Sequence, residues 1–244
     1  MGSAKRIRVE PISAADAKKI ITRFHYSGGV KPNSQLHLGV FMDGKCGGAM
    51  SFGPSIDKRK MLGLVRGTGW NNFIELNRMA FADWLPRNSE SRALGYAMKM
   101  MRRVYPHIKW VISFSDATQC GDGTIYRASG FLLTQINKNT TMIRLPDGTI
   151  VANKTLDNGA VYMSKIWKER GARPLEGYQL RYIRFLDPAW VDRLTVPTIP
   201  FSKIKEVGAS MIRGVRSDTS DTSGSQPEEG GATPTRTLSP DEPI

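Results

Sequence analysis

The amino-acid sequence predicts an α/β fold in which helices flank a mixed central sheet. In several short runs apolar and polar residues alternate, which is the period of a strand. Other segments repeat their apolar residues every three or four positions, which is the period of a helix. Along the chain these segments follow one another as helix, hairpin, strand, long helix, strand, short helix and strand.

The chain begins with a short strand-like run at residues 7–9 and a helix. Ser13 and Asp16 form a capping-box-like pair that opens this helix. The helix stops at the glycine pair 28–29, so residues 25–27 lie at its C-terminal end.

Six further segments are expected to be strands. They comprise residues 35–42, 46–52, 73–81, 109–115, 131–136 and 178–185. An Asp-Gly turn joins the first two into a hairpin. Gly47 and Gly48 in the returning strand indicate a bulge or the close approach of a neighbouring group.

Two more helices lie between these strands. The longer one begins at Asn88 or Ser89 and ends just before Pro106. The shorter one covers residues 122–129, and Gly130 is expected to end it in the left-handed conformation.

Charge divides the chain into two parts. Residues 217–244 contain six acidic residues and one basic residue, are rich in Ser, Thr, Gly and Pro, and have no aromatic side chain. Such a segment cannot bury enough apolar surface to offset the entropy of ordering, so a disordered acidic tail is expected. The tail carries −5 of the overall +13, which leaves +18 on the domain of residues 1–216. A domain this basic favours a nucleic-acid partner, because neutralised phosphates release counterions.

Composition and motifs argue against several other classes of protein. No apolar run approaches the roughly 20 residues of a membrane span, and the N-terminal residues lack the apolar core of a signal peptide. Cys46 and Cys120 form neither a disulfide framework nor a zinc pattern, so an intracellular protein is expected. The sequence around Ser115 is not a nucleophile elbow, and no base is identifiable near Cys120.

The first candidate group surrounds the start of the long helix. A helix that follows a strand presents free backbone N–H groups and a positive dipole end, which suit a phosphate or a developing oxyanion. Arg78, Arg87 and Arg92 surround this helix start. The alternative is an ordinary capped helix with solvated arginines.

The second candidate group follows the buried strand at residues 109–115. Asp116 lies at its C-terminal end, where the ligand crevices of α/β sheets open. Tyr126 lies one turn into the short helix, in a Y-x-x-x-G-F pattern that resembles the GNAT acetyltransferase superfamily. There a tyrosine in this place can protonate a leaving group. The alternative is a tyrosine that only packs.

The third candidate group is His25 with Tyr26. A histidine, whose ordinary pKa is near 6.5, suits general-base catalysis, and an aromatic ring on a loop can stack on an extruded base. Together with Asp116 these side chains offer nitrogen and oxygen ligands for a metal. The alternative is a surface histidine beside a packing tyrosine.

Six long runs of the chain are specific enough to compare with a family: HYSGG, NSQLHLGVF, GTGWNNFIELNRMAF, LPRNSESRA, YPHIKWVISFSDATQCGDGTIYRASGF and YQLRYIRFLDP. Together they resemble the Mom family, the DNA modification proteins of phage Mu and its relatives. The resemblance implies a GNAT-like fold and an enzyme that converts adenine to N6-carbamoylmethyl-adenine in phage DNA. It also implies that the enzyme works in the cytoplasm of the infected or lysogenic bacterial host and protects phage DNA from restriction.

The resemblance also implies which residues act. On the matching motifs, the residues on which the family depends correspond to His25, Tyr26, Arg78, Ser91, Asp116 and Tyr126. We expect His25, Tyr26, Asp116 and Tyr126 to be catalytic. Arg78 and Ser91, together with Arg87 and Arg92 at the helix start described above, are expected to bind the donor. A metal, iron, is proposed for the family, which favours His25, Tyr26 and Asp116 as its ligands here.

The donor of the transferred group is less well defined. GNAT enzymes usually carry a Q/R-x-x-G-x-G/A loop that cradles the pyrophosphate of coenzyme A, and residues 87–95 match it poorly. N6-carbamoylmethyl-adenine is an isomer of N6-glycyl-adenine, so transfer of a glycyl group followed by rearrangement would give it. We therefore expect glycyl-tRNA as donor, with acetyl-CoA as the alternative, and double-stranded DNA and tRNA as partners.

Two other functions are kept as alternatives. A protein or small-molecule N-acetyltransferase would bind acetyl-CoA and would need no strongly basic surface. A non-catalytic DNA-binding module would bind DNA in a salt-sensitive way and form no product. The polar residues 137–177 are hard to place, and we interpret them as an insertion that contacts DNA or a second subunit of a homodimer.

Overall fold

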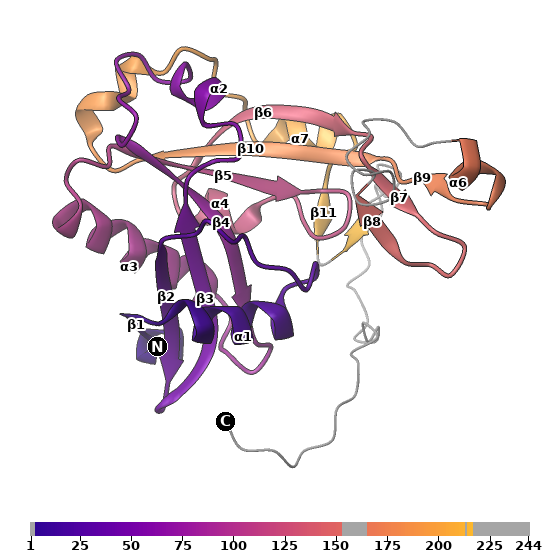
Figure 1. Ribbon diagram of the computed structural model, residues 1–244. Coiled ribbons are helices and arrows are strands. Elements are labelled where there is room, and N and C mark those ends of the chain that lie inside the picture. The colour runs from indigo at the N-terminus through magenta and orange to yellow at the C-terminus, as the bar shows by residue number, and fades with distance from the viewer. Residues whose placement is uncertain (1–2, 153–164, 213, 217–244) are drawn as a thin grey trace, which may run out of the picture.

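The computed structural model describes residues 3–152, 165–212 and 214–216 (Figure 1), and the predicted acidic tail lies outside them. The described chain forms a mixed central sheet flanked by helices, which confirms the predicted fold class. The sheet has seven strands in the order β1-β2-β3-β4-β5-β10-β6. They are β1 (Arg8–Pro11), β2 (Leu36–Met42), β3 (Lys45–Gly53), β4 (Phe73–Phe81), β5 (Trp110–Asp116), β6 (Leu132–Asn139) and β10 (Gly177–Phe185). The pair β4–β5 is parallel, and the other neighbouring pairs are antiparallel.

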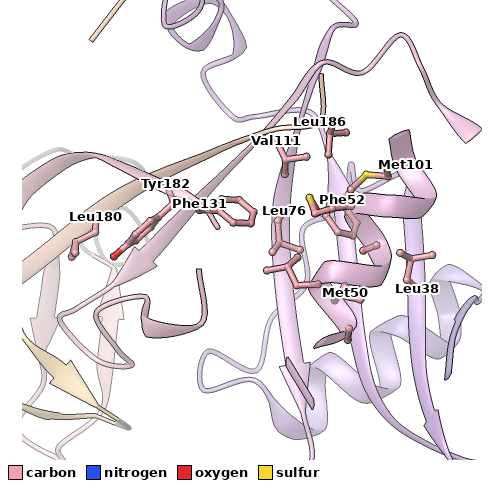
Figure 2. Packing of buried hydrophobic residues seen from close by; sticks show 14 of the residues in the cluster. Leu38, Met50, Phe52, Leu76, Met101, Val111, Phe131, Leu180, Tyr182 and Leu186 are labelled. Atoms are coloured by element: carbon pink, nitrogen blue, oxygen red, sulfur yellow. The ribbon is translucent and has the colours of Figure 1, made fainter. Parts of the chain in front are cut away.

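Helices cover both faces of this sheet. They are α1 (Ala14–Phe24), α2 (Lys58–Leu62), α3 (Ser89–Val104), α4 (Thr124–Ala128), α6 (Lys165–Glu169) and α7 (Ser202–Glu206), with 3-10 turns η1 (Ser3–Arg6) and η2 (Pro188–Arg193). Ile21 of α1 packs with Ala49 of β3, whereas Met101 of α3 shares a core with Met50 (Figure 2). Because neighbouring residues of a strand point to opposite faces, α1 and α3 lie on opposite sides of the sheet. Among the described helices, none is long and apolar enough to cross a membrane.

Short elements that the sequence did not predict occupy two further regions. Between β6 and β10 the chain forms a three-stranded sheet of β7 (Met142–Arg144), β8 (Ile150–Ala152) and β9 (Arg173–Pro174). With α6 it makes an insertion that extends beyond the end of the central sheet in Figure 1. After α7 the chain forms a small hairpin of β11 (Met211–Ile212) and β12 (Val215–Arg216).

Local signals at the helix ends are mostly confirmed. The Ser13 hydroxyl accepts a hydrogen bond from the backbone N–H of Asp16 at 3.0 Å, as a capping box requires. Gly130 has φ +72° and ends α4 in the left-handed conformation. Asn88 precedes α3 as expected, but its own φ is +69° and its side chain makes no capping hydrogen bond.

The glycine pair in β3 has both features that the sequence indicated. Val40 pairs with Gly48 and Phe41 with Cys46, so Gly47 is the extra residue of a β-bulge. A Cβ atom on Gly47 would overlap the indole ring of Trp84. The bulge therefore requires glycine for packing, not for backbone conformation.

We predict opposite effects on stability for two glycine-to-alanine changes. Gly47→Ala should lower the free energy of unfolding by about 1–3 kcal/mol, because the new methyl group forces the Trp84 ring to move. Gly95→Ala should raise it by about 0.5–1 kcal/mol, because Gly95 lies inside α3 and a methyl group added there would meet nothing within 4 Å. Urea denaturation of both variants measures these changes, and equal effects would contradict the packing argument.

Candidate active site

Strands β4 and β5 pair over a short length and then part. Their parallel pairing covers Phe73–Glu75 of β4 and Trp110–Ile112 of β5, and both strands continue beyond it. Just after the last pair, Ser51 pairs with Arg78 and Phe52 with Leu76, which leaves Asn77 as a bulge residue. A bulge bends its strand and increases the twist, so it directs β4 away from β5. The site lies in this opening between the two strands.

Tyr126 reaches the opening from α4. The Ser113 hydroxyl of β5 hydrogen-bonds the Tyr126 hydroxyl at 2.8 Å. The Tyr126 ring packs against Tyr182 and Phe131, two core residues seen in Figure 2. Burial raises the pKa of Tyr126 to about 12. The phenol is therefore protonated at neutral pH and is able to donate its proton.

Tyr26, which follows α1, reaches Asp116 at the end of β5. The Tyr26 hydroxyl donates to the Asp116 carboxylate at 3.4 Å, and burial and the Asp116 charge raise the pKa of Tyr26. Asp116 also accepts hydrogen bonds from the Thr118 backbone at 2.9 Å and the Gln119 side chain at 3.2 Å. Burial and the same carboxylate raise the pKa of the Cys120 thiol, which disfavours a thiolate nucleophile.

His25 ends α1 and stacks on Tyr26 with ring centroids 4.4 Å apart. Its Nδ1 faces the backbone N–H of Ser27 at 3.1 Å and the Ser27 hydroxyl at 2.8 Å. A backbone N–H is always a donor, so Nδ1 must be the acceptor and a neutral ring carries its proton on Nε2. Burial and the nearby charge of Arg78 lower the pKa of His25 to about 4. At neutral pH the ring thus offers an Nε2–H donor rather than a free lone pair.

Arg78 links β4 to the loop after α1. Its Nε donates to the carbonyl of Gly29 at 2.9 Å and its Nη1 to that of Asn77 at 2.9 Å. This places the guanidinium beside His25, on the side of the sheet that carries α1. Among the contacts of the described residues, none joins Arg78 to the other predicted donor-binding residues.

The other predicted donor-binding residues, Arg87, Ser91 and Arg92, lie together at the start of α3. The Ser91 hydroxyl donates to the carbonyl of Asn88 at 3.2 Å, and Arg92 donates to the Tyr96 hydroxyl at 2.8 Å. Arg87 is exposed in the preceding loop. The Ser129 hydroxyl at the end of α4 donates to the Ser91 carbonyl at 3.5 Å, so this helix start adjoins the helix that holds Tyr126.

Glu75 is a further candidate that the sequence analysis did not identify. It is 7% exposed on β4 at the last pair before the strands part. Burial raises the pKa of this carboxyl, while hydrogen bonds from Ser55 and Asn77 and the charges of Lys31 and Arg78 oppose that effect. The signal in the sequence was the acidic residue of the strand FIELNRMAF, which lies between the apolar residues Ile74 and Leu76.

The residues considered for a metal do not form a ligand set in this arrangement. A ligating histidine normally donates its second ring nitrogen to an acceptor, whereas Nδ1 of His25 faces a backbone donor. The Asp116 oxygens already accept hydrogen bonds from three groups. Across the described residues, no group of three or more His, Cys, Asp or Glu side chains is placed to hold a metal.

Sequence comparison finds a family and a relative that match most of the chain. A sequence profile of the Mom protein family matches residues 6–203. The protein named methylcarbamoylase mom, from Escherichia phage Mu, is 39% identical over 191 residues, which cover 75% of this chain and 77% of the relative.

Solved structures with a similar chain arrangement are acetyltransferases. NAA60 of Arabidopsis thaliana, in complex with a bisubstrate analogue, has a TM-score of 0.46 and 11% identity over 73% of this chain and 97% of that chain. A GNAT family acetyltransferase from Elizabethkingia anophelis with acetyl-CoA bound has a TM-score of 0.38 and 11% identity over 74% and 98%. These similarities assign no residue role and no ligand to this chain.

We predict that the His25 ring stays neutral from pH 7 down to near pH 4, with its proton on Nε2. Nitrogen-15 NMR of the histidine rings measures both the titration and the tautomer, and His25→Gln assigns the signal. Arg78→Met should raise the pKa of His25 only partway to its ordinary value, because burial is the larger cause and remains. Arg103→Met, an exposed position on α3, is the control. A proton found on Nδ1 would contradict the geometry.

Proposed function

The chain belongs to the Mom protein family, and on this premise we propose that it is a transferase that converts adenine in duplex DNA to N6-carbamoylmethyl-adenine. The name of its phage relative, a methylcarbamoylase, supports this reaction. The observation that carries the proposal is the position of Tyr126 and of the Asp116–Tyr26 pair beside the parting of β4 and β5, where the charge of Arg78 acts on the pKa of both tyrosines. In phage DNA the product protects against host restriction, within the cytoplasm of the bacterial host.

The side of the opening that carries α1 receives the adenine. An N6 amine inside a duplex is out of reach for chemistry, so the base must leave the stack. Tyr26 is 48% exposed and offers its ring for stacking with the extruded base. Asp116 accepts the proton that N6 loses, and Glu75 is a second carboxyl near the same opening. The Nε2–H of His25 donates to an acceptor on the base or on the reacting carbonyl group.

The side of the opening that carries α3 and α4 receives the donor. Tyr126 gives its proton to the departing oxygen of the donor. The start of α3, with Arg87, Ser91 and Arg92, holds a donor phosphate. Arg78 fixes the loop after α1 and contributes positive charge near the developing oxyanion.

The donor that fits the product best is a glycyl ester of tRNA. The N6 amine attacks the glycyl carbonyl, the ester C–O bond breaks, and the tRNA leaves with its hydroxyl protonated. The free amine of N6-glycyl-adenine then attacks C6, and the original N6 departs from C6. That nitrogen becomes the terminal amide, so the product is N6-carbamoylmethyl-adenine with no atom gained or lost. No step of this route requires a metal. Acetyl-CoA is the alternative donor, and attack of N6 on its carbonyl would release the coenzyme A thiol and leave N6-acetyl-adenine, which lacks the amine needed for the rearrangement.

We predict that Tyr126→Phe lowers the rate of modification by about 10²–10⁴-fold, because the leaving group loses its proton donor. Asp116→Ala should abolish modification, because the proton acceptor is lost. Mass spectrometry of nucleosides from DNA co-expressed with each variant measures the product. Tyr105→Phe, which removes a hydroxyl at the far end of α3, is the matched control and should retain full modification. Duplex binding should stay intact in both site variants, and its loss together with activity would point to a structural role instead.

The donor is tested in a purified reaction. We expect carbon-13 or nitrogen-15 glycine charged on tRNA to appear in the modified adenine of duplex DNA, with the glycine nitrogen bonded to C6 after the rearrangement. Labelled acetyl-CoA is the parallel reaction. Label that enters only from acetyl-CoA would overturn the glycyl donor and leave the proposal for the DNA target standing.

A further inference from the structure

The insertion between β6 and β10 places two arginines directly opposite each other. Arg144 of β7 and Arg173 of β9 are paired residues of an antiparallel ladder, and both are exposed. Side chains at such a pair leave the ladder on the same face, about 5 Å apart at Cβ. Like charges in this position destabilise the strand pair. Within the described parts of the chain, no carboxylate forms an ion pair with either guanidinium.

The insertion is nevertheless a packed element. Ile143 is 2% exposed and Ala172 is 1% exposed, so residues on both sides of the arginine pair are buried. Two more exposed cations, Lys168 and Arg170, lie on and just after α6, immediately before β9. The arginines are therefore held in place on an ordered surface.

This surface is tied directly to the candidate active site. At the base of the insertion Asn139 pairs with Gly177, and the Asn139 amide donates to the Thr118 hydroxyl at 3.0 Å. The backbone N–H of Thr118 donates to the Asp116 carboxylate at 2.9 Å. The arginine pair lies about five residues further along the chain, roughly 16 Å at an ordinary strand rise. A duplex carries roughly nine phosphate charges over that length.

We propose that Arg144 and Arg173 bind phosphates of the duplex that flank the adenine at the site, which makes the insertion the docking arm for duplex DNA. The proposal rests on the proposed function for its choice of partner. Anionic phosphates offset the repulsion between the two guanidinium groups, and arginine binds phosphate oxygens with two parallel hydrogen bonds. Such contacts position the duplex and read no sequence.

The experiment compares two double variants of the full-length protein that lose the same charge. Arg144→Gln/Arg173→Gln removes the paired arginines, and Lys99→Gln/Arg103→Gln removes two exposed cations of α3. Fluorescence anisotropy measures the affinity for a labelled duplex across a series of salt concentrations. Each lost phosphate contact lowers the slope of log K against log salt by about 0.9, so the arginine variant should lose nearly two units of slope and the α3 variant none. Arg144→Lys/Arg173→Lys should restore the slope, since it restores the charge.

Two outcomes would overturn the docking arm. One is an equal change in both double variants, which reflects overall charge. The other is a change in the salt slope of binding for tRNA but not for duplex DNA. That result would show that the insertion binds the tRNA of the donor instead of the DNA. Mass spectrometry of nucleosides from DNA co-expressed with the wild-type protein distinguishes failure of the two proposals. Absence of modified adenine would contradict the proposed function. The salt slope tests the docking arm independently of catalysis.

Discussion

The structure depends on the early parting of β4 and β5. Two parallel strands in a sheet ordinarily satisfy each other's backbone groups along their whole length, and here the pairing stops after three residues. The bulge at Asn77 sets this point, and its side chain accepts a hydrogen bond from Ser34 at 2.9 Å, which holds β4 to the loop before β2. Because the strands part, groups from both faces of the sheet reach one opening. Tyr126 comes from one face, and Tyr26 and His25 come from the other.

Burial, rather than ion pairing, sets the protonation states of the side chains at this opening. His25 is neutral and Tyr126 is protonated because the surroundings penalise their charged forms. Arg78 adds a fixed positive charge beside the histidine, and the Ser27 backbone N–H keeps the ring proton on one nitrogen. The result is a set of neutral donors close to the Asp116 carboxylate. Such a set suits a neutral amine that must lose a proton while a leaving group gains one.

The insertion and the site share one strand pair. The chain leads from β6 into β7 and from β9 into β10, and β10 pairs with β5 at Asp116, so the arm is connected through short links to the strand beside Asp116. A +18 domain charge attracts DNA from any direction and selects no orientation. A pair of arginines in fixed register on the insertion supplies that orientation, since a phosphate contact fixes the position of the duplex.

The sequence by itself determined the strands of the central sheet, the long helix, the capping of α1 and the Gly130 turn, because these follow from local periodicity and turn chemistry. It also indicated most of the residues that line the opening, through the matching runs of the Mom family. It did not identify Glu75 or the paired arginines. Glu75 stands out because it is buried, and the arginines stand out because they pair across two strands. Both properties depend on contacts between residues that are far apart in the chain. It grouped Arg78 with the start of α3, whereas a bulge and a hydrogen bond to Gly29 place it beside His25. Only the tertiary structure decided that the His25 ring is neutral and which nitrogen carries its proton, since these depend on burial, on a charge from another strand and on the local fold of the Ser27 backbone.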